Sequence, residues 1–245
     1  MRKISIGLAL LACLLVVRAQ ARPGAYQELG GGWDGVGGMV GLDGKLYVIS
    51  GGKLWATEKD GKYKDLGGGW AKIGGMAALD GKLYVISGGK LWATEKDGKY
   101  KDLGGGWAKI GGMAALDGKL YVISGGKLWA TEKDGKYKDL GGGWAKIGGM
   151  AALDGKLYVI SGGKLWATEK DGKYKDLGGG WSTIGGMTAL GGKLYVISGG
   201  KLWATTKDGK YQDLGGGWDQ MAGLAALDGK LYAISGGKLW AVETE

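Results

Sequence analysis

The sequence predicts an all-β fold, and three observations support this prediction. A segment of 37 residues recurs along the chain, and its three consecutive copies over residues 51–161 are identical. Each copy holds short runs of β-branched and aromatic residues between glycine-containing turns, with no sustained helical period. Glycine supplies 57 of 245 residues, which suits tight turns and disfavours helix interiors. Small sheets repeated around an axis form a β-propeller, so the sequence predicts that fold.

Four strands are expected in each unit. In the second unit they are residues 73–79, 82–87, 90–94 and 99–103. Asp-Gly turns separate the first strand from the second and the third from the fourth, and such turns between apolar runs are a strong hairpin signal. Gly-Gly turns the chain between the second and third strands. The pattern therefore predicts four-stranded antiparallel blades.

The two ends of the chain predict how the ring closes. Residues 24–245 make six whole units of 37, but the cut falls inside a blade. Residues 26–29 (YQEL) match the fourth strand of a unit, and residues 238–242 (KLWAV) match the third strand. Pairing these segments removes two open sheet edges. We therefore expect a six-bladed β-propeller whose N-terminal strand completes the last blade, over residues 22–245.

The first 21 residues have the pattern of a secretory signal peptide. A basic start precedes an apolar run over residues 4–17, and a small-x-small site ends at Ala21. The run is too short for a confident membrane span, so no membrane insertion is expected. Cys13 lies within it, which leaves the rest of the chain without a thiol. The mature protein is expected to be secreted, to the extracellular space or the periplasm.

Composition argues against several kinds of function. The formal charge is +9, but the lysines recur in every unit instead of forming one patch, so nucleic acid is not an expected partner. The chain has no histidine, which excludes Ser-His-Asp and Cys-His sites and most zinc sites. Near-identical units also lack the asymmetric constellation that catalysis needs. The sequence thus predicts no enzyme, no cofactor and no metal.

Tryptophan is the unusual residue, with two in each unit. The loop from a fourth strand to the next first strand (GGGW) and the loop between the second and third strands (SGGK) are expected to open on one face. An indole beside glycine backbone can stack on the apolar face of a sugar ring. The alternative is that both tryptophan sets are wedged between blades as packing. The GGGW set, to which we assign ligand binding, is Trp33, Trp70, Trp107, Trp144, Trp181 and Trp218; the third-strand set, for which packing is favoured, is Trp55, Trp92, Trp129, Trp166, Trp203 and Trp240.

A carboxylate in the fourth strand is the second candidate ligand group. It belongs to the recurring sequence Lys-Asp-Leu or Gln-Asp-Leu, close to the GGGW loop. Polar contacts to a ligand are one interpretation; the other is that an exposed outer strand simply needs polar residues. The five positions are Asp65, Asp102, Asp139, Asp176 and Asp213.

At these residues the sequence resembles the tachylectin-2 type of lectin propeller. The matching motifs are Gly-Gly-Trp (residues 68–70), an apolar strand (76–79), DGKLYV (80–85) and Gly-Gly-Lys (88–90). The resemblance implies a secreted lectin that binds N-acetylated amino sugars, one pocket per blade. That family has longer units, an outer loop that this chain lacks, and five blades. The sequence is also similar to kelch and tryptophan-docking propeller repeats.

Together these features predict a secreted, non-enzymatic, multivalent carbohydrate-binding propeller. Six weak sites on one ring gain avidity on a surface that displays many glycans. The alternative is a protein-interaction scaffold without a sugar site. The expected partners are accordingly glycans on cell surfaces, or proteins.

Overall fold

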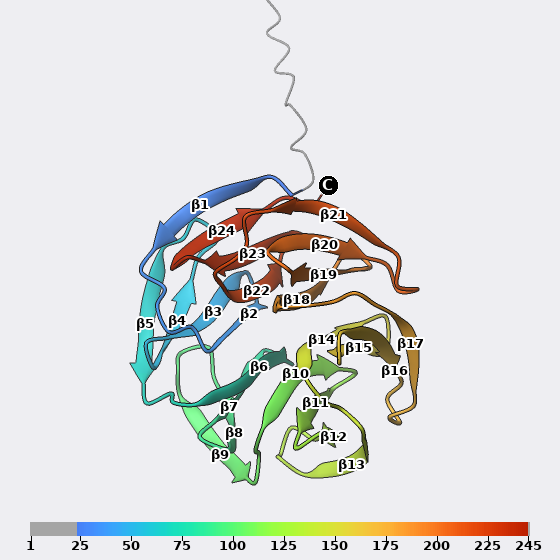
Figure 1. Cartoon of the computed structure of the whole chain (residues 1–245). Coiled ribbons are helices and arrows are strands. Elements are labelled where there is room, and N and C mark those ends of the chain that lie inside the picture. Colours follow the sequence, from blue (N-terminus) through green and yellow to red (C-terminus); the bar gives the residue numbers. More distant parts are fainter. Residues whose placement is uncertain (1–23, 245) are drawn as a thin grey trace, which may run out of the picture.

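The computed structural model describes residues 24–244, which form six four-stranded antiparallel sheets arranged in a ring (Figure 1). The prediction of a six-bladed β-propeller is confirmed. The predicted signal peptide, residues 1–21, lies outside the described residues.

Each blade follows the chain from the innermost strand to the outermost one. Blade 1 contains β2 (Gly38–Leu42), β3 (Lys45–Ser50), β4 (Lys53–Thr57) and β5 (Tyr63–Gly68). Blade 2 contains β6 (Ile73–Leu79), β7 (Lys82–Ser87), β8 (Lys90–Thr94) and β9 (Tyr100–Gly105). Blade 3 contains β10 (Ile110–Leu116), β11 (Lys119–Ser124), β12 (Lys127–Thr131) and β13 (Tyr137–Gly142).

The second half of the ring repeats this order. Blade 4 contains β14 (Ile147–Leu153), β15 (Lys156–Ser161), β16 (Lys164–Thr168) and β17 (Tyr174–Gly179). Blade 5 contains β18 (Ile184–Leu190), β19 (Lys193–Ser198), β20 (Lys201–Thr205) and β21 (Tyr211–Gly216). Blade 6 contains β22 (Met221–Leu227), β23 (Lys230–Ser235), β24 (Lys238–Val242) and, from the other end of the chain, β1 (Tyr26–Gly31).

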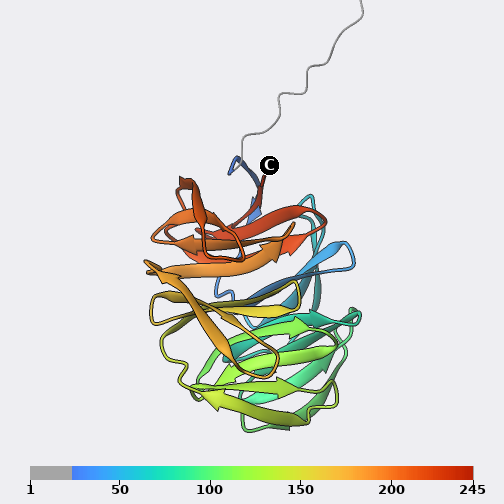
Figure 2. The ribbon, with the colours of Figure 1, turned by 90° about the vertical axis from the view of Figure 1, so that its right-hand side faces the viewer.

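Blade 6 closes the ring as the sequence predicts. β1 pairs antiparallel with β24, with Gln27 opposite Ala241 (Figures 1 and 2). Beyond the strands, the backbone N–H of Glu243 donates to the carbonyl of Ala25 at 2.8 Å. The Nζ of Lys238 lies 2.8 Å from a carboxylate oxygen of Glu28. The two ends of the described chain are thus joined by backbone and side-chain contacts.

The outer strands run further than the sequence suggested. In β9 the pairing extends to Gly105, which lies opposite Lys90, two residues beyond the expected end at residue 103. A β-bulge between Lys90 and Trp92 permits this extension, because the outer strand takes an extra residue there. The first two glycines of GGGW therefore belong to the strand.

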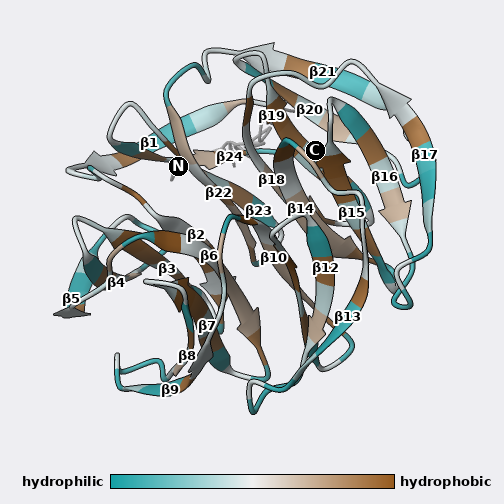
Figure 3. Cartoon of the chain, turned by 60° about the horizontal axis from the view of Figure 1, so that its bottom comes forward, coloured by the Kyte–Doolittle hydropathy of each residue, from teal (hydrophilic) through white to brown (hydrophobic). Residues whose placement is uncertain are grey.

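The core lies between blades and not within one. In β3, Tyr47 and Ile49 pack with Leu83 and Val85 of β7 in the next blade. On the opposite face of β3, Leu46 and Val48 pack with the preceding blade. The second strand of every blade is therefore apolar on both sides, and Figure 3 shows the hydrophobic colours on the inner strands and hydrophilic ones on the outer strands and turns.

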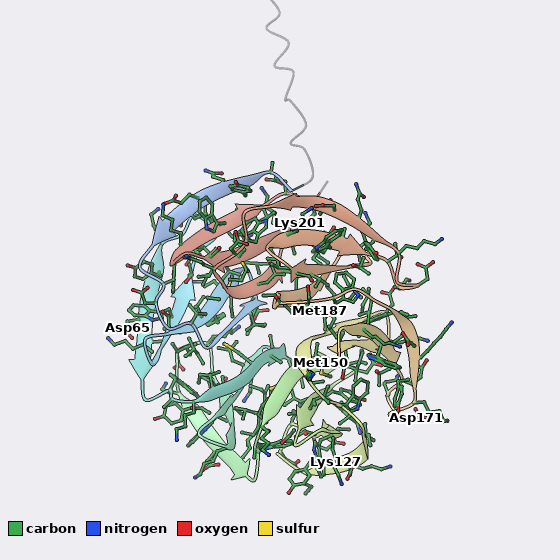
Figure 4. All side chains as sticks on the ribbon, viewed as in Figure 1. Asp65, Lys127, Met150, Asp171, Met187 and Lys201 are labelled. Atoms are coloured by element: carbon green, nitrogen blue, oxygen red, sulfur yellow. The ribbon has the colours of Figure 1, made fainter. Side chains whose placement is uncertain are left out.

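Glycine sets the approach of the blades near the axis. A Cβ at Gly75 would lie 2.9 Å from the Cβ of Met113 in the next blade, closer than side chains pack. A channel of about 250 Å³ runs along the axis, lined by methionine, alanine and other small or apolar residues of the six innermost strands. Met150 and Met187 lie beside this axis in Figure 4.

Ion pairs join neighbouring blades at the Asp-Gly turns. Lys96 of blade 2 lies 2.7 Å from Asp43 of blade 1. At the junction of blades 5 and 6, Gly191 stands at the position of the aspartate and Thr244 at the position of the lysine, so the acid and the base are replaced together. The five pairs are Lys59–Asp228, Lys96–Asp43, Lys133–Asp80, Lys170–Asp117 and Lys207–Asp154.

A substitution in the outer turn tests the blade packing. Gly98 has φ +93°, and a Cβ there would overlap the carbonyl oxygen of Leu66 in the preceding blade. Gly81 has φ +73° with open space around it, so it serves as the matched control. We expect Gly81→Ala to lower the free energy of unfolding by about 1–2 kcal/mol, the usual cost of a left-handed alanine. Gly98→Ala should lower it by roughly 1–3 kcal/mol more, because the blades must separate. Equal urea midpoints for the two variants would contradict this packing.

Candidate functional site

The GGGW and SGGK loops meet on one face of the ring, as predicted. The backbone N–H of Trp33 donates to the carbonyl of Gly237 in the preceding blade at 3.1 Å. The N–H of Gly51 and the hydroxyl of Ser50 both donate to the carbonyl of Asp34, at 3.0 and 2.6 Å. Each GGGW loop is therefore held between the SGGK loops of two blades.

The six GGGW tryptophans fill the junctions between blades. Their side chains are only 4–8% exposed. Trp33, for example, packs on Leu46 and Val48 of blade 1 and on Tyr232 and Leu239 of blade 6. The packing alternative therefore describes this set, and the prediction that a sugar ring stacks on these indoles is corrected: their faces are covered by the neighbouring blades. The set comprises Trp33, Trp70, Trp107, Trp144, Trp181 and Trp218.

The third-strand tryptophans, which the sequence analysis assigned to packing, are only partly buried and pack against the core. The indole N–H of Trp55 donates to the carbonyl of Ser50 at 3.1 Å, which fixes the ring. The ring of Tyr63 meets Trp55 edge-on, with centroids 5.4 Å apart, and meets Trp33 at 5.2 Å. Their position in the third strand could have predicted this partial exposure, because the third strand lies further from the core than the second.

A lysine and a carboxylate border each aromatic group. The Nζ of Lys53 lies 5.5 Å from the ring centroid of Trp55 and 2.7 Å from Asp65. Asp65 also accepts the N–H of Gly67 at 2.8 Å. The hydrogen bond from Lys53, and then that from Gly67, lowers the pKa of Asp65 below its ordinary range.

The five aspartates predicted as ligand groups occupy equivalent positions in blades 1 to 5. Each accepts a lysine ammonium and a glycine N–H, and each has a lowered pKa for the same two causes. In blade 6 the equivalent acid is Glu28, paired with Lys238. The structure therefore groups these acids with the third-strand tryptophans, and Figure 4 places Asp65 at the rim of the ring. The aspartates are Asp65, Asp102, Asp139, Asp176 and Asp213.

Small pockets open between these groups. One of about 180 Å³ is lined by Trp33, Trp55, Tyr63, Lys53 and the neighbouring loops. Its counterpart in blade 5 measures about 220 Å³ and has the equivalent tryptophans, tyrosine and lysine. Among the described residues, the indole N–H of the GGGW tryptophan has no hydrogen-bond partner and is not sealed from solvent. Each pocket thus offers aromatic walls, one unused donor and a charged rim.

A larger groove lies at the Asp-Gly turns between blades 1 and 2. It measures about 780 Å³, and its charged side chains include the ion pair of Lys45 with Glu58, at 2.7 Å. Tyr47 lines it, and burial raises the pKa of its hydroxyl. A hydrogen bond from Lys45 to Glu58 raises the pKa of that lysine, which favours the charged ammonium. Most of the groove's charges already have partners, so it offers less to a ligand than the aromatic pockets.

Within residues 24–244, no three side chains among His, Cys, Asp and Glu come together in a way that could hold a metal ion. The same part of the chain contains no helix that is long and apolar enough to cross a membrane.

Comparison with known proteins finds likeness in structure only. No protein-family model matches the sequence, and no curated protein matches it. A gluconolactonase from Xanthomonas campestris superposes with a TM-score of 0.76 at 15% identity, over 90% of this chain and 89% of that one. The PQQ-bound aldose sugar dehydrogenase from Streptomyces coelicolor gives 0.71 at 17%, over 92% and 100%. The calcium-binding protein regucalcin from Agrobacterium tumefaciens gives 0.72 at 12%, over 91% and 95%. At these identities the likeness establishes the shared propeller fold.

The comparison corrects the functional prediction. The prediction of a non-enzymatic lectin is wrong, because the chains that share this ring include a gluconolactonase and an aldose sugar dehydrogenase. The prediction that the chain is not an enzyme is contradicted by the same neighbours. That prediction rests on repeat symmetry and on the absence of histidine from the sequence. The structural neighbours are gluconolactonase and regucalcin propellers, and a lectin of the tachylectin-2 type is not shown.

The site carboxylates make stability depend on pH. A carboxyl whose pKa is lower in the folded state stabilises the fold above its unfolded pKa and loses that effect as the pH falls through its folded pKa. The contribution of these carboxylates to the urea midpoint should therefore be constant above about pH 5 and fall progressively below it. Changing the five aspartates to asparagine should make the curve shallower. An unchanged slope in that variant would show that the five Lys–Asp pairs do not contribute.

Proposed function

We propose that this chain is a small-molecule-binding propeller that holds one small organic molecule in each blade. The pocket lies between the third-strand tryptophan, the outer-strand tyrosine and the edge of the GGGW tryptophan. The observation that carries the proposal is the repetition of this arrangement: a tyrosine that contacts both tryptophans, bordered by a Lys–carboxylate pair, recurs in every blade, and a pocket opens there in blades 1 and 5.

The composition of the pocket fits a small ligand. Binding sites for small molecules are concave and mostly apolar, with a few polar groups that fix orientation. A volume of 180–220 Å³ corresponds to about six or seven water molecules, so it suits one compact group. The indole N–H of Trp33 is the group that would donate to an acceptor on the ligand.

The walls are held in place before a ligand arrives. The N–H of Trp55 is fixed by the carbonyl of Ser50, and the hydroxyl of Ser50 is fixed by the GGGW loop. Trp33 is locked between two blades. A preorganised site loses less conformational entropy on binding. Six such sites on one rigid ring also favour a partner that presents the ligand many times. Export of the protein and the identity of such a partner stay predictions from the sequence.

The test uses 3,3-dimethylbutan-1-ol, a compact neutral alcohol, with residues 22–245 and saturation-transfer NMR. We expect saturation transfer to the tert-butyl group. Changing the six outer-strand tyrosines to serine should reduce it several-fold, because one wall is lost. These side chains are 54–59% exposed, so the fold should persist. They are Tyr26, Tyr63, Tyr100, Tyr137, Tyr174 and Tyr211.

The matched control changes lysines on the other face of the outer strands. Lys64, Lys101, Lys138 and Lys175 are exposed and lie outside the aromatic pocket. Their change to alanine should leave saturation transfer intact. The same spectra are read for new signals from a product, because chains of this fold include enzymes. Equal signals from the tyrosine variant and the parent would contradict the proposal.

A further inference from the structure

We infer that the aromatic pockets select organic cations of the alkylammonium class, and that a lysine of the chain occupies the cation position beside each third-strand tryptophan when no ligand is bound. This inference rests on the proposed function and names its ligand.

The lysines mark a cation position over an aromatic face. Their Nζ atoms lie 5.5–5.9 Å from the ring centroids of the third-strand tryptophans, within the range of cation–π attraction. Tryptophan is the aromatic residue that attracts cations most strongly. Lys127 and Lys201, labelled in Figure 4, occupy equivalent places in blades 3 and 5. The full set is Lys53, Lys90, Lys127, Lys164, Lys201 and Lys238.

A carboxylate completes the cation site on the other side. Each Nζ lies 2.7–2.8 Å from Asp65 or its equivalent, with Glu28 in blade 6. An aromatic face and an ionised carboxylate around one point attract a positive group and repel a negative one. Neutral ligands gain the aromatic contact alone.

The lysine can leave this position at little cost. Its side chain is about half exposed in every blade, for example 51% at Lys53. Exposed ion pairs contribute little to stability, and the long lysine stem can extend into water. A lysine ammonium is strongly hydrated, whereas aromatic sites are known to suit quaternary ammonium groups. A methylated ammonium should therefore displace it.

The test compares choline with 3,3-dimethylbutan-1-ol, which has nearly the same shape but no charge. Titrations are followed by tryptophan fluorescence and by NMR. We expect choline to bind about threefold tighter or more. Equal affinity would overturn the cation inference while the pocket proposal stands. If neither compound binds, the proposed function itself fails.

A misfolded variant would bind less tightly, so a variant that is expected to bind more tightly gives a result that misfolding cannot produce. Changing the six lysines to glutamine empties the cation position, so choline should bind at least about threefold tighter than to the parent, with no matching gain for the alcohol. Changing the five aspartates to asparagine and Glu28 to glutamine should weaken choline alone. Unchanged choline affinity in the lysine variant would show that lysine does not occupy the ligand position.

Discussion

Burial of each blade between two neighbours is the constraint on which this structure depends. The second strand is apolar on both faces, so a single blade cannot bury itself. Only a closed ring gives every blade two partners. The pairing of β1 with β24 supplies the last junction, where the core includes Trp33 and Leu46 of one blade with Tyr232 of the other. Near-identical units can therefore form one stable body without capping repeats.

The same junctions create the aromatic pockets. The GGGW indole is buried because it seals the space between two blades, and its edge becomes the inner wall of the pocket. The third-strand tryptophan lies further out and keeps part of its face open. Both tryptophans of a unit therefore line the pocket, and the GGGW tryptophan also packs the junction between blades. In blade 1, packing between the blades fixes Trp33, and a hydrogen bond to the Ser50 carbonyl fixes Trp55.

Much of the fold could be predicted from the sequence. Repeat period, turn dipeptides and the match of YQEL to the outer strand were sufficient for the blade number and the closure. The exposure of each tryptophan could not be predicted, because it depends on how the GGGW loop crosses between blades. Lys53 and Trp55 are two residues apart on one strand, so the sequence does place them on the same face. It could not show that the ammonium lies over the indole or that it pairs with Asp65.

Function was harder to predict from the sequence than either the fold or the position of the site residues. Short glycine-rich motifs match many propellers, and the lectin interpretation rests on such a match together with the GGGW tryptophans. Missing histidine argued against some catalytic sites, but the fold is shared with enzymes. What the structure adds is a specific arrangement of aromatic rings, lysine and carboxylate, which the motif comparison did not contain. Fold-level likeness and site chemistry are separate kinds of evidence.

Native-state hydrogen exchange tests ring closure most directly. If closure makes the ring one cooperative body, amides of β1 and β24 should open with a free energy within about 1 kcal/mol of the average for the third and fourth strands of blades 1–4, whose peptides are identical in sequence. Peptides from the two ends differ in sequence from the repeats, so mass spectrometry can separate them. Rapid exchange confined to β1 and β24 would contradict the account, because blade 6 would then open without the rest of the ring.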